Sequence, residues 1–140
     1  MKRLMLIVTG SFMLSGCVAQ QAVIPTNTYD FFAEDIVSKT RNGIDNIERF
    51  YAFFENVQSG KRDQVRIVEH TIEGDPIYVD VRHNNEQINL EIDNSEDAYS
   101  NGEVVSTTCN QLNAIEVGSR TDYYVSECSD DEQYIIFSDY

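Results

Sequence analysis

Positive charge is scarce in this 140-residue chain. Ten Lys and Arg side chains stand against 24 Asp and Glu, which gives a formal net charge of −14 at pH 7. Because phosphate binding needs clustered Lys and Arg, this shortage argues strongly against nucleic acid as a partner. It also argues against direct adhesion to anionic lipid or to anionic wall polymers. A basic protein, a cationic peptide or divalent cations stay compatible with the charge, although the solubility of an exported protein explains it more simply.

The sequence also has little with which to build a catalytic or metal site. Its two histidines are His70 and His83. If the chain turns within EGDP, His70 faces Val79 and His83 lies near Arg66, which separates the two rings by roughly 13 Å, too far for one metal ion. No GxSxG, HExxH, SxxK or P-loop motif occurs, and acidic residues are too common for a glycosidase-like pair to stand out. We therefore expect no enzymatic activity and no cofactor.

Long apolar runs are missing after residue 14. The one run that is present, residues 4–14, follows Lys2 and Arg3. It is too short to span a bilayer, which needs about 20 apolar residues, but it has the form of a signal-peptide core. It ends in the tetrapeptide LSGC at 14–17. This tetrapeptide resembles the bacterial lipobox, whose cysteine carries a thioether-linked diacylglycerol after the chain is cleaved before it.

The lipobox resemblance implies an address at the cell membrane. Residues 1–16 would be a lipoprotein signal peptide, and Cys17 would be the lipidated N-terminus of the mature chain. Two acyl chains anchor a protein stably where one is marginal. We therefore expect a protein that the diacylglycerol holds on the outer, extracytoplasmic face of a cell membrane. An ordinary signal peptide with a chance cysteine, or an uncleaved anchor, are the alternatives.

The length of the mature chain predicts one globular domain behind a tether. We assign residues 17–40 to the lipidated N-terminus and tether, and residues 41–140 to a single domain. The stretch YDFFAEDIVSKTRNG, residues 29–43, is too apolar to remain in water. It is expected to form a short strand or helical turn that docks on the domain.

The segment GIDNIERFYAFFENVQSGK, residues 43–61, is the clearest helix. Its apolar side chains recur at steps of three or four and form one stripe. The stripe consists of Ile44, Ile47, Phe50, Tyr51, Phe54 and Val57. Asn42 is the expected N-cap, and Gly60 suits the left-handed position that ends a helix. This spacing favours packing against a core over an aromatic ligand groove.

From Gln64 onward, apolar and polar residues alternate, as they do in half-buried strands. The predicted strands are 64–72, 76–83, 88–93, 104–117 and 122–129, with a sixth over 133–140 at a sheet edge. Tight turns between them indicate an antiparallel meander with one wet face. The sequence therefore predicts an α+β fold, in which one N-terminal amphipathic helix packs on an antiparallel five- to six-stranded meander.

Two cysteines remain once Cys17 is committed to lipid. If Gly118 and Ser119 form a two-residue hairpin turn, Cys109 lies directly opposite Cys128. Directly paired residues have Cα atoms about 4.5–5.5 Å apart, which a disulfide accepts. We expect a structural disulfide that stabilises the fold by roughly 3 kcal/mol. A redox-active pair is the alternative, but it usually needs CxxC spacing, which is absent here.

One acidic segment has the spacing of a calcium loop. Asp93, Ser95 and Asp97 occupy positions 1, 3 and 5 of an EF-hand-like stretch, but Ala98 replaces its glycine and Val104 replaces its bidentate glutamate. A polar turn explains the same residues. We therefore keep Asp93, Ser95 and Asp97 as metal candidates without assigning a metal.

Three stretches resemble members of one family in layout. They are IERFYAFFENVQSGKRDQVRIVEHTIEGDPIYVDV, INLEIDNSEDAYSNGEVVSTTC and DYYVSEC. The TIEGDPI turn and the spacing of the last two cysteines carry most of this likeness. The family comprises small lipoproteins of Gram-positive, bacillus-type bacteria, catalogued only as a domain of unknown function. The resemblance implies a lineage and a location, and it implies no activity.

Binding is the function that these observations favour. We expect a non-catalytic interaction or inhibitory module that engages an envelope or extracellular protein through the wet face of the sheet. The candidate contacts are Tyr78, Arg82, His83 and Tyr124. The alternative is a lipoprotein that binds a small ligand or a divalent cation at residues 93–97. An acid-dependent hydrolase is the third hypothesis.

Overall fold

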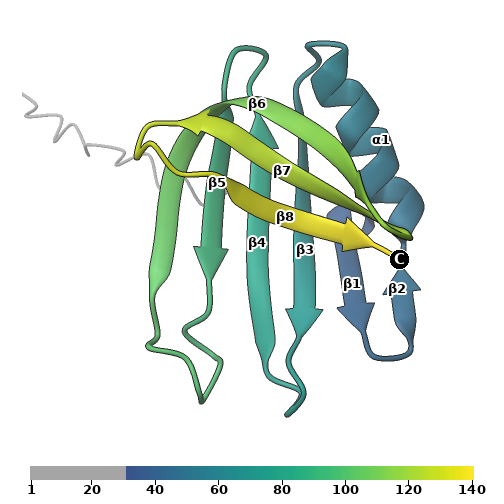
Figure 1. The fold of residues 1–140 in the computed structure, drawn as a ribbon, viewed down its shortest axis with the longest axis vertical. Helices are drawn as coiled ribbons and strands as arrows, with labels where there is room; N and C mark the ends of the chain where they lie inside the picture. The colour runs from purple at the N-terminus through teal and green to yellow at the C-terminus, as the bar shows by residue number, and fades with distance from the viewer. Residues whose placement is uncertain (1–30) are drawn as a thin grey trace, which may run out of the picture.

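Eight strands form one curled sheet around a single α-helix in the computed structural model, which describes residues 31–140 (Figure 1). The strand order is β2-β1-β3-β4-β5-β6-β7-β8. The predicted signal peptide, the predicted lipidation site at Cys17 and most of the predicted tether lie outside the described residues. Within residues 31–140, no helix is long and apolar enough to cross a membrane.

The chain enters the fold through a short N-terminal unit. A 3₁₀ turn, η1 (Ala33–Asp35), leads into β1 (Ile36–Thr40) and β2 (Gly43–Asp45), which form a small hairpin. Strand β1 also pairs in parallel with β3, so that fully buried Val37 lies beside Ile67. The sheet therefore begins at residue 36, within the stretch assigned to the tether.

The remaining strands follow one another as an antiparallel meander. They are β3 (Asp63–His70), β4 (Pro76–His83), β5 (Ile88–Asp93), β6 (Val104–Val117), β7 (Arg120–Cys128) and β8 (Tyr134–Asp139). Three of them, β4, β5 and β6, have the bounds that the alternation of the sequence predicted. The other three differ from the prediction by one or two residues at each end, which is the usual uncertainty of such boundaries.

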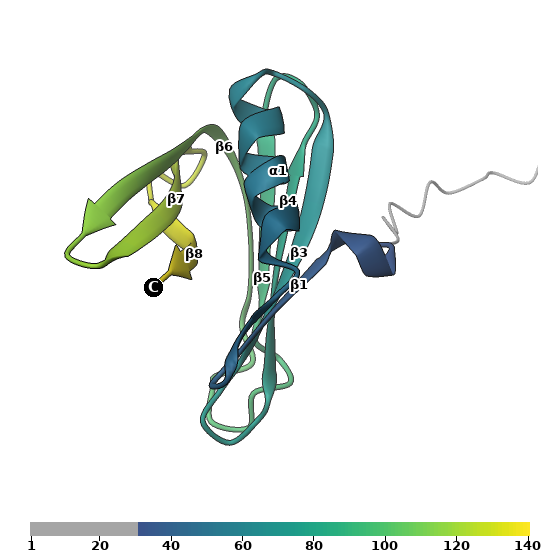
Figure 2. The same cartoon turned by 90° about the vertical axis from the view of Figure 1, so that its right-hand side faces the viewer.

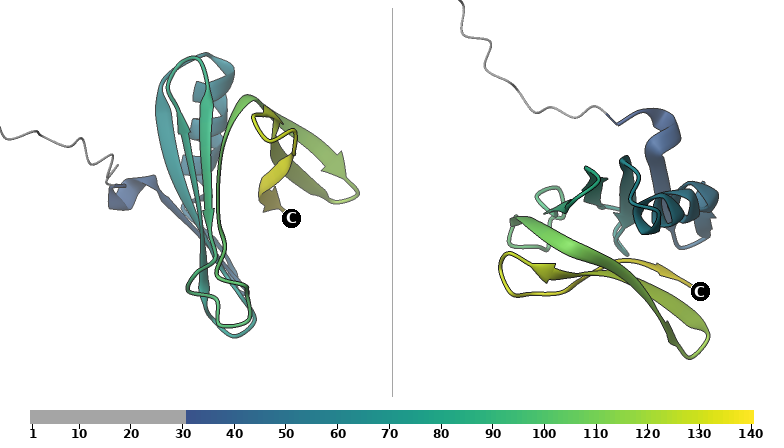
Figure 3. Two further views of the ribbon diagram at one scale, coloured as in Figure 1. Left: turned by 90° about the vertical axis from the view of Figure 1, so that its left-hand side faces the viewer. Right: turned by 90° about the horizontal axis from the view of Figure 1, so that it is seen from above.

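Strand β6 bends the sheet into a half-barrel. Residues 104–109 pair with β5, whereas residues 109–117 pair with β7. The second half of β6, β7 and β8 thereby turn back toward the helix and form a second wall, as the views in Figures 2 and 3 show. We call this second wall, residues 111–139, the wing.

The disulfide Cys109–Cys128 is present at this bend. The β6–β7 hairpin turns at Gly118, whose φ of 66° is the conformation that the first central residue of a two-residue turn needs. The register from Val117↔Arg120 to Cys109↔Cys128 is the predicted one. The pairing of the two cysteines is thus confirmed.

The helix α1 (Ile47–Gln58) lies between the two walls (Figure 2). Phe50 and Phe53 are fully buried. The ring of Phe50 meets Phe137 of the wing at 4.2 Å and Tyr123 at 4.8 Å between centroids. Edge and tilted contacts of this kind add to the area that aromatic rings bury.

The helix begins four residues later than predicted. Asn46 is its N-cap, and the Asn46 side chain donates hydrogen bonds to the carbonyls of Ile36 at 2.9 Å and Glu34 at 3.1 Å. Asn42, the predicted cap, lies in the β1–β2 turn instead, and Ile44 lies in β2. The apolar stripe was extended too far toward the N-terminus because a three-residue strand contributes one apolar residue in phase with the helix.

The predicted α+β class is wrong. The protein is mostly β, with an eight-stranded half-barrel that encloses one short helix. Two N-terminal strands extend the sheet at one side, and the bend in β6 folds its other side over the helix. Phe53, which the predicted stripe omitted, is fully buried in the core.

Candidate binding face on the outer side of the sheet

Alternation along β3, β4 and β5 creates two unlike faces. Val65, Val81 and Leu90 stand opposite one another and point toward the helix, where they are fully or almost fully buried. Their neighbours in sequence point away from it. We call this side of β3–β5 the outer face. Its side chains form rows across the strands, and one such row joins Arg66, Asp80 and Glu91.

A buried carboxylate organises the outer face. Asp80 accepts hydrogen bonds from Arg66 Nε at 2.6 Å and Arg66 Nη2 at 2.7 Å. It also accepts one from Arg82 Nη2 at 3.1 Å. The hydrogen bonds to Asp80 raise the pKa of Arg66 above its ordinary value. Paired N–H groups on one carboxylate fix the plane of a guanidinium as well as its position.

Aromatic rings flank the two guanidinium groups. The guanidinium carbons of Arg66 and Arg82 each lie 4.6 Å from the ring centroid of Phe31. The ring of Tyr78 lies 5.4 Å from the guanidinium carbon of Arg66. These distances are within the range of cation–π attraction. We call the five residues Phe31, Arg66, Tyr78, Asp80 and Arg82 the arginine–aromatic cluster.

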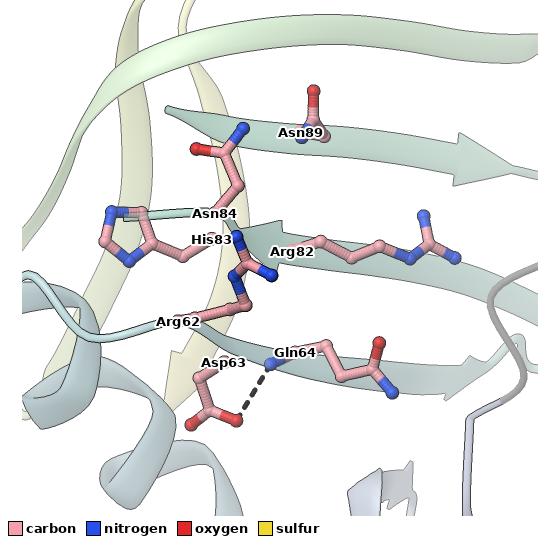
Figure 4. A pocket seen from close by; sticks show the side chains of 7 residues that line it. All are labelled: Arg62, Asp63, Gln64, Arg82, His83, Asn84 and Asn89. Carbon is pink, nitrogen blue, oxygen red and sulfur yellow. Dashed lines mark hydrogen bonds between the residues drawn. The ribbon is translucent and has the colours of Figure 1, made fainter. Parts of the chain in front are cut away.

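Two hollows border the cluster. The larger has a volume of about 490 Å³ and lies where β3 begins and β4 ends (Figure 4). It is lined by Arg62, Asp63, Gln64, Arg82, His83, Asn84 and Asn89. Its guanidinium and amide groups offer several N–H donors, which suit carboxylate or carbonyl oxygens. The Asp63 carboxylate is held by Arg49 and Asn56 of the helix.

The second hollow, of about 300 Å³, lies toward the other end of the same strands. It is lined by Arg66, Tyr78, Asp80, Glu91, Asp93 and Glu96. The two ends of the outer face therefore differ, because hydrogen-bond donors line the larger hollow and carboxylates line the smaller one. Among residues 31–140, no group of three His, Cys, Asp or Glu side chains is arranged to hold a metal ion.

The four predicted contact residues do not form one surface. Tyr78 and Arg82 belong to the arginine–aromatic cluster on the outer face. His83 points inward with Val81, and its buried ring lies 2.7 Å from the Lys61 carbonyl through Nδ1. Tyr124 lies in β7, within the wing. The alternation that placed Tyr78 and Arg82 outward also places His83 inward, so assigning His83 to the wet face was wrong.

The predicted register of the two histidines was wrong as well. His70 pairs with Pro76, and His83 pairs with Asp63. The β3–β4 connection contains five residues instead of two, because the Thr71 N–H donates to the Asp75 carbonyl at 2.9 Å and the Asp75 N–H donates to Thr71 Oγ1 at 3.1 Å. A connection of five residues instead of two changes which residues of β3 and β4 stand opposite each other.

The acidic segment 93–97 forms turns. Asp93 Oδ1 accepts the Ser95 N–H at 2.9 Å, and Asp97 Oδ1 accepts the Tyr99 N–H at 3.0 Å. Hydrogen bonds from Ser95 hold the pKa of Asp93 below its usual range. Each of these two carboxylates therefore accepts the backbone N–H of the residue two positions later, as in an Asx turn.

Three residues of the cluster, Phe31, Arg66 and Asp80, were not predicted as site residues from the sequence. Arg66 and Asp80 carried a usable signal, since both are charged residues at outward positions of adjacent predicted strands. Phe31 carried none, because its partners are more than thirty residues away in the chain.

Residues 33–124 match a known family, described as Domain of unknown function (DUF4362). The matched region runs from η1 into β7 and contains all of β3–β5 and Cys109, whereas Cys128 and β8 follow it. No curated protein and no solved structure matches the chain.

Proposed function

The chain belongs to the DUF4362 family, whose function is unknown, and we propose that it is a non-catalytic protein-binding module of the bacterial cell envelope. In this proposal, diacylglycerol on Cys17 holds the protein on the extracytoplasmic face of the membrane. The outer face of β3–β5 then engages another envelope or extracellular protein. The LSGC tetrapeptide supports the anchor, and a structural disulfide is typical of proteins outside the cytoplasm.

The arginine–aromatic cluster is the observation that carries the proposal. Arg and aromatic side chains are enriched at the centres of protein interfaces and among their energetic hot spots. Here Asp80 and Phe31 already hold Arg66 in place. A preordered side chain loses less conformational entropy when a partner binds. The cluster therefore has both the composition and the preorganisation that a binding centre needs.

The larger hollow supports a second candidate, a small polar ligand. Its volume of about 490 Å³ falls within the usual range of ligand pockets. Arg62, Asn84 and Asn89 would donate hydrogen bonds to a carboxylate or carbonyl of such a ligand. A rise in melting temperature with a small dicarboxylate such as succinate, absent in Asn89→Leu, would favour this candidate over a protein partner.

Site-specific photo-crosslinking in the native membrane tests the protein-binding proposal. A photoreactive phenylalanine analogue replaces Tyr78 in the full chain, and the matched control places it at Tyr99, an exposed tyrosine outside the cluster. We expect one discrete crosslinked protein from position 78 and none from position 99. The crosslink should be lost when Arg66→Ser is added. Equal crosslinking from both positions, or none from position 78, would contradict the proposal.

Intact mass spectrometry of the protein from its own membranes tests the anchor. We expect a mature chain that begins at a diacylated Cys17. A chain that keeps residues 1–16, or that has an unmodified cysteine, would refute lipid anchoring while leaving the binding face untouched.

A further inference from the structure

The wing ends in an open sheet edge. Within residues 31–140, β8 pairs with β7 alone and closes the strand order on that side. In an antiparallel pair, alternate residues direct their N–H and C=O groups to the same neighbour. The other residues of β8 therefore present their backbone groups at the open edge, which is a template for another strand.

Strand β8 itself carries little of the charge that usually protects a sheet edge. Residues 134–138 of β8 carry no charged side chain, although natural edge strands are commonly blunted by lysine or by other charges. Ile135 is 59% exposed. Tyr124 pairs with Ile135, so both side chains point to the side of the wing that faces away from the helix.

Two other exposed apolar residues of the wing lie two strands away from the open edge. Ile115 is 51% exposed and Val117 is 47% exposed. Both lie in β6 and alternate with Ala114 and Glu116, so they share the side of Tyr124, whose partner in β6 is Asn113. They stand opposite Asp122 and Arg120 of β7, so only Tyr124 and Ile135, which we call the wing stripe, adjoin the edge. An exposed apolar stripe beside an open edge is typical of an interaction site.

The charged residues near β8 indicate which kind of strand would bind its open edge. Asp130, Asp131 and Glu132 precede β8, and Asp139 ends it. A second copy of this chain in antiparallel pairing would bring Asp139 of each copy next to the acidic triplet of the other. Like charges in facing positions destabilise strand pairs. Basic residues of an incoming strand would instead find opposite charge at the acidic triplet, whereas Lys39 lies at the other end of β8, 4.8 Å from the Tyr140 ring centroid.

We propose that β8 is a docking edge for an extended, cationic segment of a partner protein. The segment adds to the sheet as a further strand, and one of its apolar side chains lies beside Ile135 while its Lys or Arg residues meet the acidic triplet that precedes β8. Backbone pairing supplies affinity in strand addition, and the side-chain contacts supply specificity. This surface is separate from the outer face of β3–β5 and does not depend on the proposed function.

Peptide titration of the full-length protein in detergent tests the proposal. The probe is a fluorescein-labelled peptide of ten residues in which Lys and Val alternate. One matched peptide has Glu in place of Lys, and another keeps the Lys–Val sequence but carries N-methyl groups on alternate residues. We expect measurable binding of the first peptide by fluorescence anisotropy, and at least tenfold weaker binding of the other two. Equal binding of the N-methylated peptide would overturn strand addition, because it would show charge attraction alone.

Protein variants locate the site. Ile135→Lys should weaken binding of the Lys–Val peptide at least tenfold, since it places a positive charge on the stripe. Ile72→Lys is the matched control, because Ile72 is exposed in the β3–β4 connection and should leave binding unchanged. Ile135→Ser provides a second test if Ile135→Lys fails to fold. Equal binding by wild type, Ile135→Lys and Ile135→Ser would refute the proposal, as would a stable dimer in sedimentation that does not bind the peptide.

Discussion

Cys109 and Cys128 lie opposite each other at the point where β6 exchanges β5 for β7 as its partner, with their Cα atoms 3.9 Å apart. Cys109 also pairs with Ile88 of β5. Both cysteines are buried against the core. The disulfide therefore fixes the corner of the half-barrel, from which the wing turns back over the helix.

Loss of this bond should weaken the fold without changing its topology. The bond joins residues 19 positions apart, and closing a loop of that length stabilises a protein by about 3 kcal/mol. We expect the double variant Cys109→Ser/Cys128→Ser to lose about 3 kcal/mol of unfolding free energy in urea denaturation. A reducing agent should destabilise the wild type to a similar extent and leave the double variant unaffected. A reductant effect on the double variant would point to another cause.

Arg49 should be the most sensitive ion-pair residue of the helix. It donates hydrogen bonds to Asp63 at 2.6 and 3.1 Å, to Asp35 at 3.2 and 3.3 Å, and to the Gln64 carbonyl. It thereby ties the helix to η1 and β3. Arg49→Met should reduce the unfolding free energy by about 2 kcal/mol, because two partly buried carboxylates lose their cation. Arg41→Met, at an exposed turn residue, is the control and should change it by less than about 0.5 kcal/mol.

Acid should destabilise the protein partly through Asp63. Burial works against the charged form of this carboxyl, but hydrogen bonds from Arg49 and Asn56 outweigh it and hold the pKa of Asp63 below its usual value of 3.8. The stability that ionised Asp63 contributes is thus full above that value and is lost as the pH falls through the lower pKa of the folded state. We expect Asp63→Asn to be less stable than wild type at pH 7 and to lose less stability between pH 5 and pH 2.

Urea midpoints measured across that pH range decide the outcome. Asp131→Asn, at an exposed turn residue, is the matched control. Its urea midpoint should fall with decreasing pH as steeply as that of wild type. A slope for Asp63→Asn equal to that of wild type would contradict the assignment.

Alkali should act on the contact between the helix and the wing. Tyr51 donates a hydrogen bond to Asp139, and burial together with this bond raises the pKa of Tyr51. The contribution of neutral Tyr51 is therefore complete below the ordinary tyrosine value of about 10 and declines as the pH rises above it. Tyr51→Phe should lose about 1 kcal/mol at pH 7. It should also show a smaller loss of melting temperature between pH 9 and pH 11, and an unchanged loss would sink this explanation.

Phe53 should matter as much as any residue of the core. It is fully buried between the walls, whereas Phe32 is 63% exposed. Phe53→Ala should lower the unfolding free energy by about 3 kcal/mol, since it removes a buried ring and leaves a cavity. Phe32→Ala should change it by less than about 0.5 kcal/mol. Similar effects of the two substitutions in urea denaturation would mean that the helix packs differently.

The strands and the disulfide were predictable because short-range rules determine them. Alternation with turn residues at both ends defined 76–83, 88–93 and 104–117 to the residue. The two-residue turn at Gly118 then set the register that places Cys109 opposite Cys128. By contrast, the β3–β4 register was missed because a five-residue connection allows several pairings.

The curl of the sheet was not predictable from alternation, which tells which side of a strand is buried but not where the sheet bends. Strand β6 did offer a hint, since its 14 residues exceed the usual strand length of about 5–6. The expected short strand or helical turn within residues 29–43 is confirmed by η1 and β1, but its pairing partner was not predicted. Val37 is buried because β1 pairs in parallel with β3, although the whole helix separates these two strands in the sequence.

The candidate site, too, was only partly predictable from the sequence. Tyr78 and Arg82 were found from the period of β4. Phe31 was not, because its ring meets two guanidinium groups that the sheet brings together from β3 and β4. A local pattern can place charged side chains on one face, but it cannot show what stacks on them.

The sequential strand order bears on how the chain assembles. From β3 to β8, every strand pairs with the next one along the chain, so each pairing closes only a short loop. Folds dominated by such local pairings reach the native state faster than folds with distant ones. The exception is β1, which must wait for the helix and β3. The segment nearest the predicted membrane anchor is therefore the part of the sheet whose docking depends most on structure formed later in the sequence.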